Sequence, residues 1–120
     1  MENEALWIKQ FPAAITVCDR EGKILAMNDR SCEANEADGG ARLIGTNLFD
    51  CHPEPARSKL RQLLQSGAPN CYTIEKAGQK KMIIQSPWYE RGTYKGFVEI
   101  SMPIPAVMPH FIRDAKGQGT

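Results

Sequence analysis

The sequence lacks the features that mark several large classes of protein. It has no apolar run long enough to cross a bilayer, and its N-terminus has neither the basic region nor the apolar stretch of a secretory signal. Its net charge is only +1, from 15 basic and 14 acidic residues, so no phosphate-neutralising face for nucleic acid is indicated. We therefore expect a cytoplasmic protein with no membrane partner and no direct nucleic-acid partner, unless the chain is a piece of a larger receptor.

Cysteine motifs and phosphate loops are also missing. The four cysteines form no Cys-x-x-Cys pair and no c-type haem attachment motif, and their wide spacing argues against zinc. They are Cys18, Cys32, Cys51 and Cys71. In a reducing compartment such scattered thiols are small buried hydrophobes. The only glycine pair, residues 39–40, lies in a polar turn and breaks a helix instead of cradling a phosphate.

What is present predicts one domain of the α+β class. The chain has 120 residues, of which 42% are hydrophobic and 24% charged, as in an ordinary globular domain. Periodicity and turn signals predict helices over residues 2–10, 29–35 and 56–66, short helices within 41–49, and strands over 13–18, 23–28, 71–75, 81–88 and 94–102. Runs of strands separated by helices, without βαβ alternation, predict an antiparallel sheet with helices on one face.

The N-terminal segment, residues 1–10, is expected to be a cap helix, ahead of a main domain over 11–105 and a tail over 106–120. Leu6, Trp7 and Phe11 form an apolar stripe that must pack against something. Two interpretations remain open: the stripe docks on its own domain, or it is the contact of a homodimer.

Several motifs, in this order and spacing, resemble those of the PAS domain family over residues 11–105. Residues 12–24 resemble the first PAS hairpin, with an acidic residue and a glycine in the turn. Asn28 resembles the asparagine that follows the second strand. Residues 43–49 resemble the turn before the long helix, and 96–100 the start of the final strand.

The resemblance implies a five-stranded antiparallel sheet in the order 2-1-5-4-3, with helices closing a central pocket. It also implies a role in signal transduction, by sensing a small molecule or by binding a signalling partner protein. PAS domains pass their signal to a kinase, a cyclase or, in transcription regulation, a DNA-binding domain. The fold alone does not specify the ligand.

Two cofactor chemistries known in PAS domains are disfavoured by single residues. In haem-binding PAS domains a histidine lies on the long helix after a Pro-Glu-Pro motif like residues 53–55, and here that position is Leu60, which cannot bind iron. In light-sensing flavin PAS domains a cysteine follows a Gly-x-Asn turn like residues 45–47, and here Leu48 stands there. Haem ligation by His52 or Cys51 in another geometry, and non-covalent flavin, remain open.

Cys51 and His52 raise the question of a nucleophilic enzyme. Because they are adjacent in sequence, we expect their side chains to diverge, and no third residue suggests itself to orient the histidine. The simpler interpretation is that His52 caps or packs at the start of the helix while Cys51 fills the core. We expect no catalytic activity.

The resulting hypothesis is a non-catalytic PAS sensor or interaction module that binds a small organic ligand or a protein partner. The alternatives are a haem- or flavin-binding redox or gas sensor, and a pure dimerisation module. The interior is either an apolar ligand pocket or a core filled by side chains. The candidates for its wall are Leu48, Cys51, His52, Leu60 and Leu64 from the helical side, and Ile15, Val17, Ile84, Val98 and Ile100 from the strands, whose inward face alternation alone does not fix.

Overall fold

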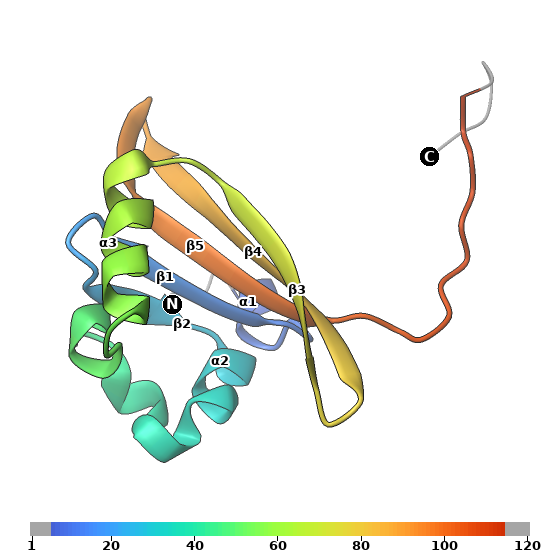
Figure 1. Cartoon of the computed structure of the whole chain (residues 1–120), viewed down its shortest axis with the longest axis horizontal. Coiled ribbons are helices and arrows are strands. Elements are labelled where there is room, and N and C mark those ends of the chain that lie inside the picture. The colour runs from blue at the N-terminus through green and yellow to red at the C-terminus, as the bar shows by residue number, and fades with distance from the viewer. Residues whose placement is uncertain (1–5, 115–120) are drawn as a thin grey trace.

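Five antiparallel strands form one sheet in the computed structural model, which describes residues 6–114 (Figure 1). The strands are β1 (Ala14–Asp19), β2 (Ile24–Met27), β3 (Asn70–Lys76), β4 (Gln79–Glu90) and β5 (Thr93–Pro103). Their order across the sheet is β2-β1-β5-β4-β3, so the predicted α+β class and strand order are confirmed.

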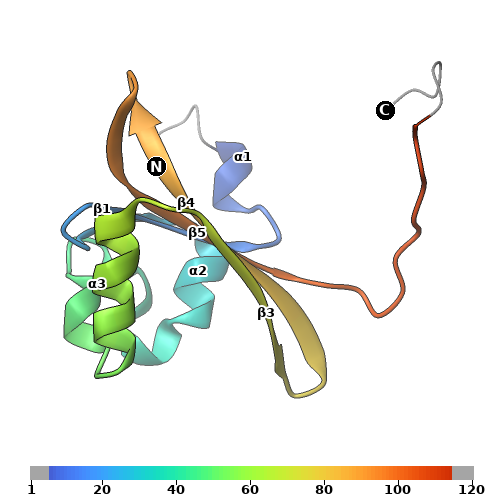
Figure 2. The ribbon, with the colours of Figure 1, turned by 45° about the horizontal axis from the view of Figure 1, so that its top comes forward.

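Helices and helical turns connect the second strand to the third and cover one face of the sheet (Figure 2). They are α2 (Asp29–Ala34), η2 (Glu36–Asp38), η3 (Gly40–Leu43), η4 (Leu48–Cys51) and α3 (Ala56–Ser66). The short helix α1 (Leu6–Lys9) lies on the other side of the sheet. No helix within residues 6–114 has the length and apolar character needed to cross a bilayer.

Asn28 joins three elements through one buried side chain that is 1% exposed. Its Oδ1 accepts hydrogen bonds from the backbone N–H of Ile15 at 2.8 Å and of Ser31 at 3.0 Å, so it bonds β1 and caps the N-terminus of α2. Its Nδ2 donates to the carbonyls of Ala13 at 2.8 Å and Ile8 at 3.1 Å. The first strand, α2 and α1 are therefore held together by one amide.

Gly96 allows the two central strands to approach closely. Its φ is +153°, and a Cβ atom built there would overlap the Cys18 carbonyl oxygen and lie 2.7 Å from the Cα of Asp19 on β1. The indole of Trp88, on the next strand, crosses above Gly96 and donates to that carbonyl oxygen at 3.0 Å. Glycine is required here because any side chain would push β1 and β5 apart.

The long helix α3 begins and ends on side-chain and glycine signals. Glu54 accepts hydrogen bonds from the Ser58 N–H and hydroxyl, each at 2.8 Å, and Gly67 closes the last turn in a left-handed conformation. Leu64, on its sheet-facing side, is the buried residue of this helix. It packs with Cys18 and Phe97 in the main hydrophobic cluster.

Both ends of the chain leave the sheet with exposed apolar side chains. At the N-terminus, Leu6, Trp7 and Phe11 are 60%, 70% and 44% exposed, so the predicted stripe does not dock on its own domain. Residues 1–5 of the predicted helix lie outside the described residues, as do residues 115–120 of the tail. After β5, the chain is anchored where the Ile104 N–H bonds the Lys80 carbonyl and then extends away from the domain (Figure 1).

The strand β3 is the least supported element of the sheet. It lies at an edge, pairs only with β4, and none of its residues is buried. The β3–β4 hairpin therefore projects beyond the helices that cover the rest of the sheet (Figures 1 and 2).

Candidate functional site

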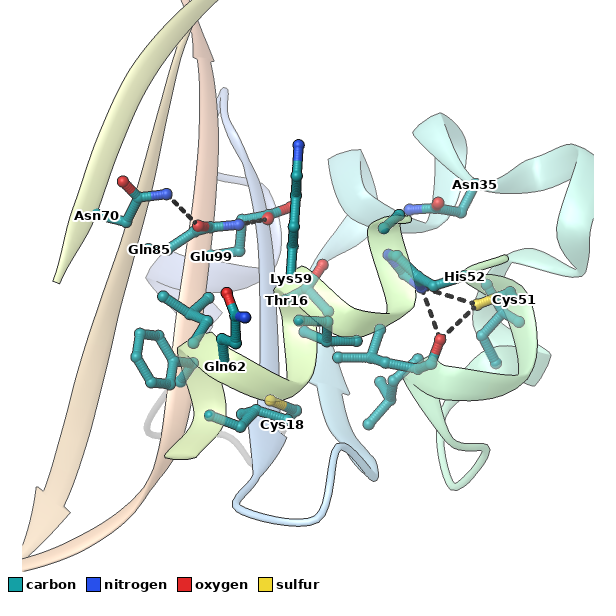
Figure 3. A pocket seen from close by; sticks show the side chains of 18 of the residues that line it. Thr16, Cys18, Asn35, Cys51, His52, Lys59, Gln62, Asn70, Gln85 and Glu99 are labelled. Carbon is teal, nitrogen blue, oxygen red and sulfur yellow. Dashed lines mark hydrogen bonds between the residues drawn. The ribbon is translucent and has the colours of Figure 1, made fainter. Parts of the chain in front are cut away.

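A cavity of about 850 Å³ lies between the sheet and the helical segments that cover it (Figure 3). The helix α3 forms one wall and the inward side chains of β1, β5, β4 and β3 form the other. The volume is within the usual range for small-molecule sites, so the interior is only partly filled by side chains.

The helix-side candidates predicted from the sequence all line this cavity. Leu48 and Cys51 contribute from η4, His52 from the residue that follows it, and Leu60 and Leu64 from α3. They come together because a helical period of 3.6 residues puts one stripe of α3 over the sheet, while η4 turns the chain back toward the same space.

The strand candidates were assigned to the wrong face. The residues that lie on the far side of the sheet are Ile15, Val17, Ile84, Val98 and Ile100. Their immediate neighbours, Thr16 and Cys18 on β1 and Phe97 and Glu99 on β5, face the cavity instead. The error has a physical cause: the outward face carries the more hydrophobic residues, and it is half-buried on the side where α1 lies.

A row of polar side chains, which the sequence analysis missed, crosses the cavity face of the sheet. Thr16, Glu99, Gln85 and Asn70 are cross-strand neighbours on β1, β5, β4 and β3 in turn. Asn70 Nδ2 donates to Gln85 Oε1 at 2.9 Å, and Gln85 Nε2 donates to Glu99 Oε2 at 2.8 Å (Figure 3). The only signal in the sequence was that these polar residues interrupt otherwise apolar strands. Polar residues on a solvent-facing side of the sheet give the same pattern.

The other end of the row is tied to α2. The hydroxyl groups of Thr16 and Ser31 form a hydrogen bond at 2.5 Å, and Ser31 is fully buried beneath the cavity wall. Because Ser31 also donates its N–H to Asn28, the polar row continues into the junction of α1, α2 and β1.

One end of the cavity is apolar. Cys18, Leu64 and Phe97 are each 4% exposed, and Tyr94 packs edge-on against Phe97 with the ring centroids 6.0 Å apart. Burial is the main cause that raises the pKa of the Cys18 thiol, which keeps it protonated and inert. The Tyr94 hydroxyl donates to the Leu64 carbonyl at 2.7 Å and so fixes the end of α3.

Cys51 and His52 behave differently from the prediction. Their side chains do not diverge, because both turn toward the Leu48 carbonyl: His52 Nδ1 donates to it at 2.6 Å and Cys51 Sγ at 3.5 Å. Cys51 is exposed at the rim of the cavity and does not fill the core.

This pair is not arranged as a nucleophile and its base. The Nδ1 atom of His52 lies 3.8 Å from the Cys51 sulfur but carries the hydrogen that it donates to Leu48, so it cannot take the thiol proton. Partial burial and the charge of Asp38 raise the pKa of the Cys51 thiol, which is opposite to the shift that activates a catalytic cysteine.

Few residues could hold a metal or haem iron. Within residues 6–114 there is no group of three or more His, Cys, Asp or Glu side chains with metal-binding geometry. His52 keeps only its Nε2 atom for a ligand bond, and Leu60 lies on the wall of α3 at the position where haem-binding PAS domains carry the axial histidine.

Comparison with known proteins identifies the fold. A family model described as the PAS fold matches residues 8–70, more than half of the chain. The PAS domain of Bordetella pertussis BvgS superposes with a TM-score of 0.58 at 21% identity, covering 85% of this chain and 84% of that one. The Aer2 receptor of Vibrio cholerae, described as a dual PAS-heme oxygen sensor, gives a TM-score of 0.58 at 15% identity, covering 78% and 95%.

A third solved structure belongs to a larger protein. The VqmA dimer of Vibrio cholerae, described with LuxR-type receptors, gives a TM-score of 0.63 at 13% identity and covers 88% of this chain but 54% of that one. No match was found among curated proteins. At these identities the structural likenesses establish the fold.

Proposed function

Because this chain belongs to the PAS-fold family, a family of signalling sensor modules, we propose that it binds a small organic ligand in its cavity and has no catalytic activity of its own. The observation that carries the proposal is the cavity of about 850 Å³, with an apolar end at Phe97 and a polar row on the sheet. Such a combination of shape and a few convergent polar groups is typical of small-molecule sites.

The test is to purify the protein, denature it and identify released small molecules by mass spectrometry. A Leu60→Trp variant is expected to release none, because the indole would occupy the cavity. Gln65→Trp is the matched control, since Gln65 is exposed on the same helix and does not line the cavity. Equal release from both variants would show that the molecules bind elsewhere, and a protein that neither releases nor binds a small molecule would contradict the proposal.

The alternative of a haem sensor is favoured by one observation, the likeness to the PAS-heme Aer2 receptor, and is opposed by Leu60; the flavin alternative has no such observation and is opposed by Leu48 in its photochemical form. An absorbance spectrum of protein from a host supplied with both cofactors decides between them. We expect neither a Soret band nor a flavin spectrum. A Soret band that disappears in His52→Ala would instead support iron ligation through Nε2.

We further propose that the exposed apolar stripe of α1 and the turn after it is the contact of a homodimer or of a signalling partner. Leu6, Trp7 and Phe11 are exposed apolar side chains close together in one short segment, and such clusters mark interaction sites. In light scattering, Leu6→Ala/Trp7→Ala should yield monomers, whereas Val107→Ala/Phe111→Ala in the exposed tail should leave the mass unchanged. An unchanged mass for the first variant would exclude α1 as the interface, and a dimer with an empty cavity would favour the pure dimerisation module.

The domain boundaries and the cellular role are part of the same proposal. We assign residues 11–105 to the sensor, 1–10 to a cap helix and 106–120 to a tail that leads to the output partner. The four free thiols suit the reducing cytoplasm. Regulation of transcription is one possible output, and identification of proteins crosslinked to the tail would test it.

A further inference from the structure

The polar row that crosses the cavity offers hydrogen-bond acceptors to whatever binds there. Asn70 donates to Gln85, and Gln85 donates to Glu99, so both amides point their N–H groups in the same direction along the row. This order uses one of the two N–H donors of each amide inside the row, so each amide keeps its second N–H. The oxygen atoms of the row that accept no hydrogen bond within it are Oε1 of Glu99, which carries the carboxylate charge, and Oδ1 of Asn70.

The Glu99 carboxylate forms no ion pair with the lysine side chains of residues 6–114. The lysine ion pairs in that part of the chain are Lys9–Asp29 and Lys95–Glu90, and neither includes Glu99. The Glu99 charge also acts on the neighbouring strand, because the pKa of the half-exposed Tyr72 hydroxyl is raised first by partial desolvation and then by the Glu99 carboxylate. A cationic or donor-rich group would therefore be attracted to this part of the cavity.

Lys59 on α3 is the cation that lines the facing wall, and it would attract an anionic ligand. Its side chain is exposed and carries neither an ion pair nor a hydrogen bond to the row among the described residues. Glu99 is held differently: it lies on the central strand β5 and Gln85 fixes one of its oxygens. The carboxylate is the better preorganised of the two charges.

Together these observations lead us to infer that the ligand is a small organic amine. Its protonated nitrogen would bond the free Oε1 of Glu99, and its apolar body would lie toward Phe97, Leu60 and Leu64. This inference rests on the proposed function, since it names the chemical class of ligand for the same cavity.

Three probes of matched shape separate charge from size: phenethylamine, 2-phenylethanol and 3-phenylpropionate. Their dissociation constants are measured by ¹⁵N chemical-shift titration of the full chain, following the amides of β5 and α3. We expect the amine to bind at least about tenfold more tightly than the carboxylate, the ratio set by one charge-assisted hydrogen bond in a partly exposed site.

Two variants locate the source of that preference. Glu99→Gln keeps the shape and the hydrogen bond to Gln85, and it should reduce the preference for the amine to about twofold or less. Lys59→Gln should keep the preference. Both variants change exposed side chains, so unchanged spectra and melting temperatures are expected to show that they fold.

The possible failures are distinguishable. Tighter binding of 3-phenylpropionate, equal binding of all three probes, or an amine preference that survives Glu99→Gln would overturn the inference while leaving a small-molecule site in place. If none of the three probes shifts the cavity amides but the purified protein releases a small molecule, the inference fails and the site remains. If no probe shifts the amides and nothing is released, the proposed ligand-binding function itself fails.

Discussion

Replacement of Asn28 by alanine tests whether one amide holds the N-terminal part of the domain together. The substitution removes two acceptor contacts to the N–H groups of Ile15 and Ser31, and two donor contacts to the carbonyls of Ala13 and Ile8. At about 1 kcal/mol for each net hydrogen bond, with extra cost for the buried groups left unpaired, the loss is roughly 3–5 kcal/mol. That is a large share of the stability of a domain of this size, which is on the order of 5–15 kcal/mol.

The assay is urea unfolding followed by circular dichroism, together with a thermal melt. A loss of this size should lower the melting temperature by roughly 10–20 °C. Hydrogen exchange adds a local readout: the amides of α2 should lose protection first, because Asn28 is the N-cap of that helix.

Asn47→Ala is the matched control. Asn47 is also an N-cap, since its Oδ1 accepts from the Phe49 N–H at 2.9 Å and its Nδ2 donates to the Glu21 carbonyl at 2.9 Å. It is only half-buried, so water replaces the lost contacts and the cost should be about 1 kcal/mol. If the two variants lose stability within about 1 kcal/mol of each other, burial does not decide the cost and the reasoning for Asn28 is refuted.

Two further predictions concern the sheet and α3. Gly96→Ala should lower the free energy of unfolding by roughly 2–6 kcal/mol, through backbone strain and overpacking against β1. Gly78→Ala is the control, because the space around Gly78 is open and only the strain of its positive φ should lower its stability. Equal melting temperatures of the two variants would contradict this. Ser58→Ala should raise the pKa of Glu54 in a carbon-detected NMR titration, because it removes the hydroxyl hydrogen bond that is the largest cause of the lowered pKa, while the backbone N–H of residue 58 still donates. The lowered pKa stabilises the folded state above the unfolded-state pKa, and this contribution is lost as the pH falls through the folded-state pKa. The variant should therefore lose less stability on acidification, and an unchanged titration would show that the Ser58 hydroxyl is not the cause.

The order of elements could be predicted from the sequence because its signals are local. Turn residues after β1, the proline-rich start of α3 and Gly67 at its end mark boundaries that the structure keeps within a few residues. The apolar stripe of α3 was also assigned correctly, because a helix with one such stripe has only one face that can pack on the sheet.

The inward face of the sheet could not be predicted for a reason specific to this protein. In β1 and β5 the choice lay between the pair Ile15–Ile100 and the neighbouring pair Thr16–Glu99, and hydrophobicity favours burying the first pair. The cavity reverses that expectation because its wall is partly polar. Successive residues of a strand point to opposite faces of the sheet, but this alternation does not say which of the two faces the helices cover. Only the tertiary structure determines that face.

Cys51 shows a second limit of the sequence. As an apolar residue beside a helix start it was assigned to the core, but η4 turns the chain so that the thiol lies at the exposed rim. Short 3₁₀ turns have no periodic signature, so the orientation of their side chains depends on contacts distant in sequence, here the bridge between Lys23 and Asn47.

The weakly supported strand β3 is the part of the cavity wall that we expect to open most easily. It supplies Asn70 and Tyr72 to the wall, yet it is hydrogen-bonded on one side only and buries none of its residues. Edge elements of this kind open locally at a small fraction of the global unfolding free energy. We therefore expect the proposed ligand to enter and leave through transient fraying of β3. Its residence time would then depend on this hairpin, while the selectivity would depend on the strands behind it.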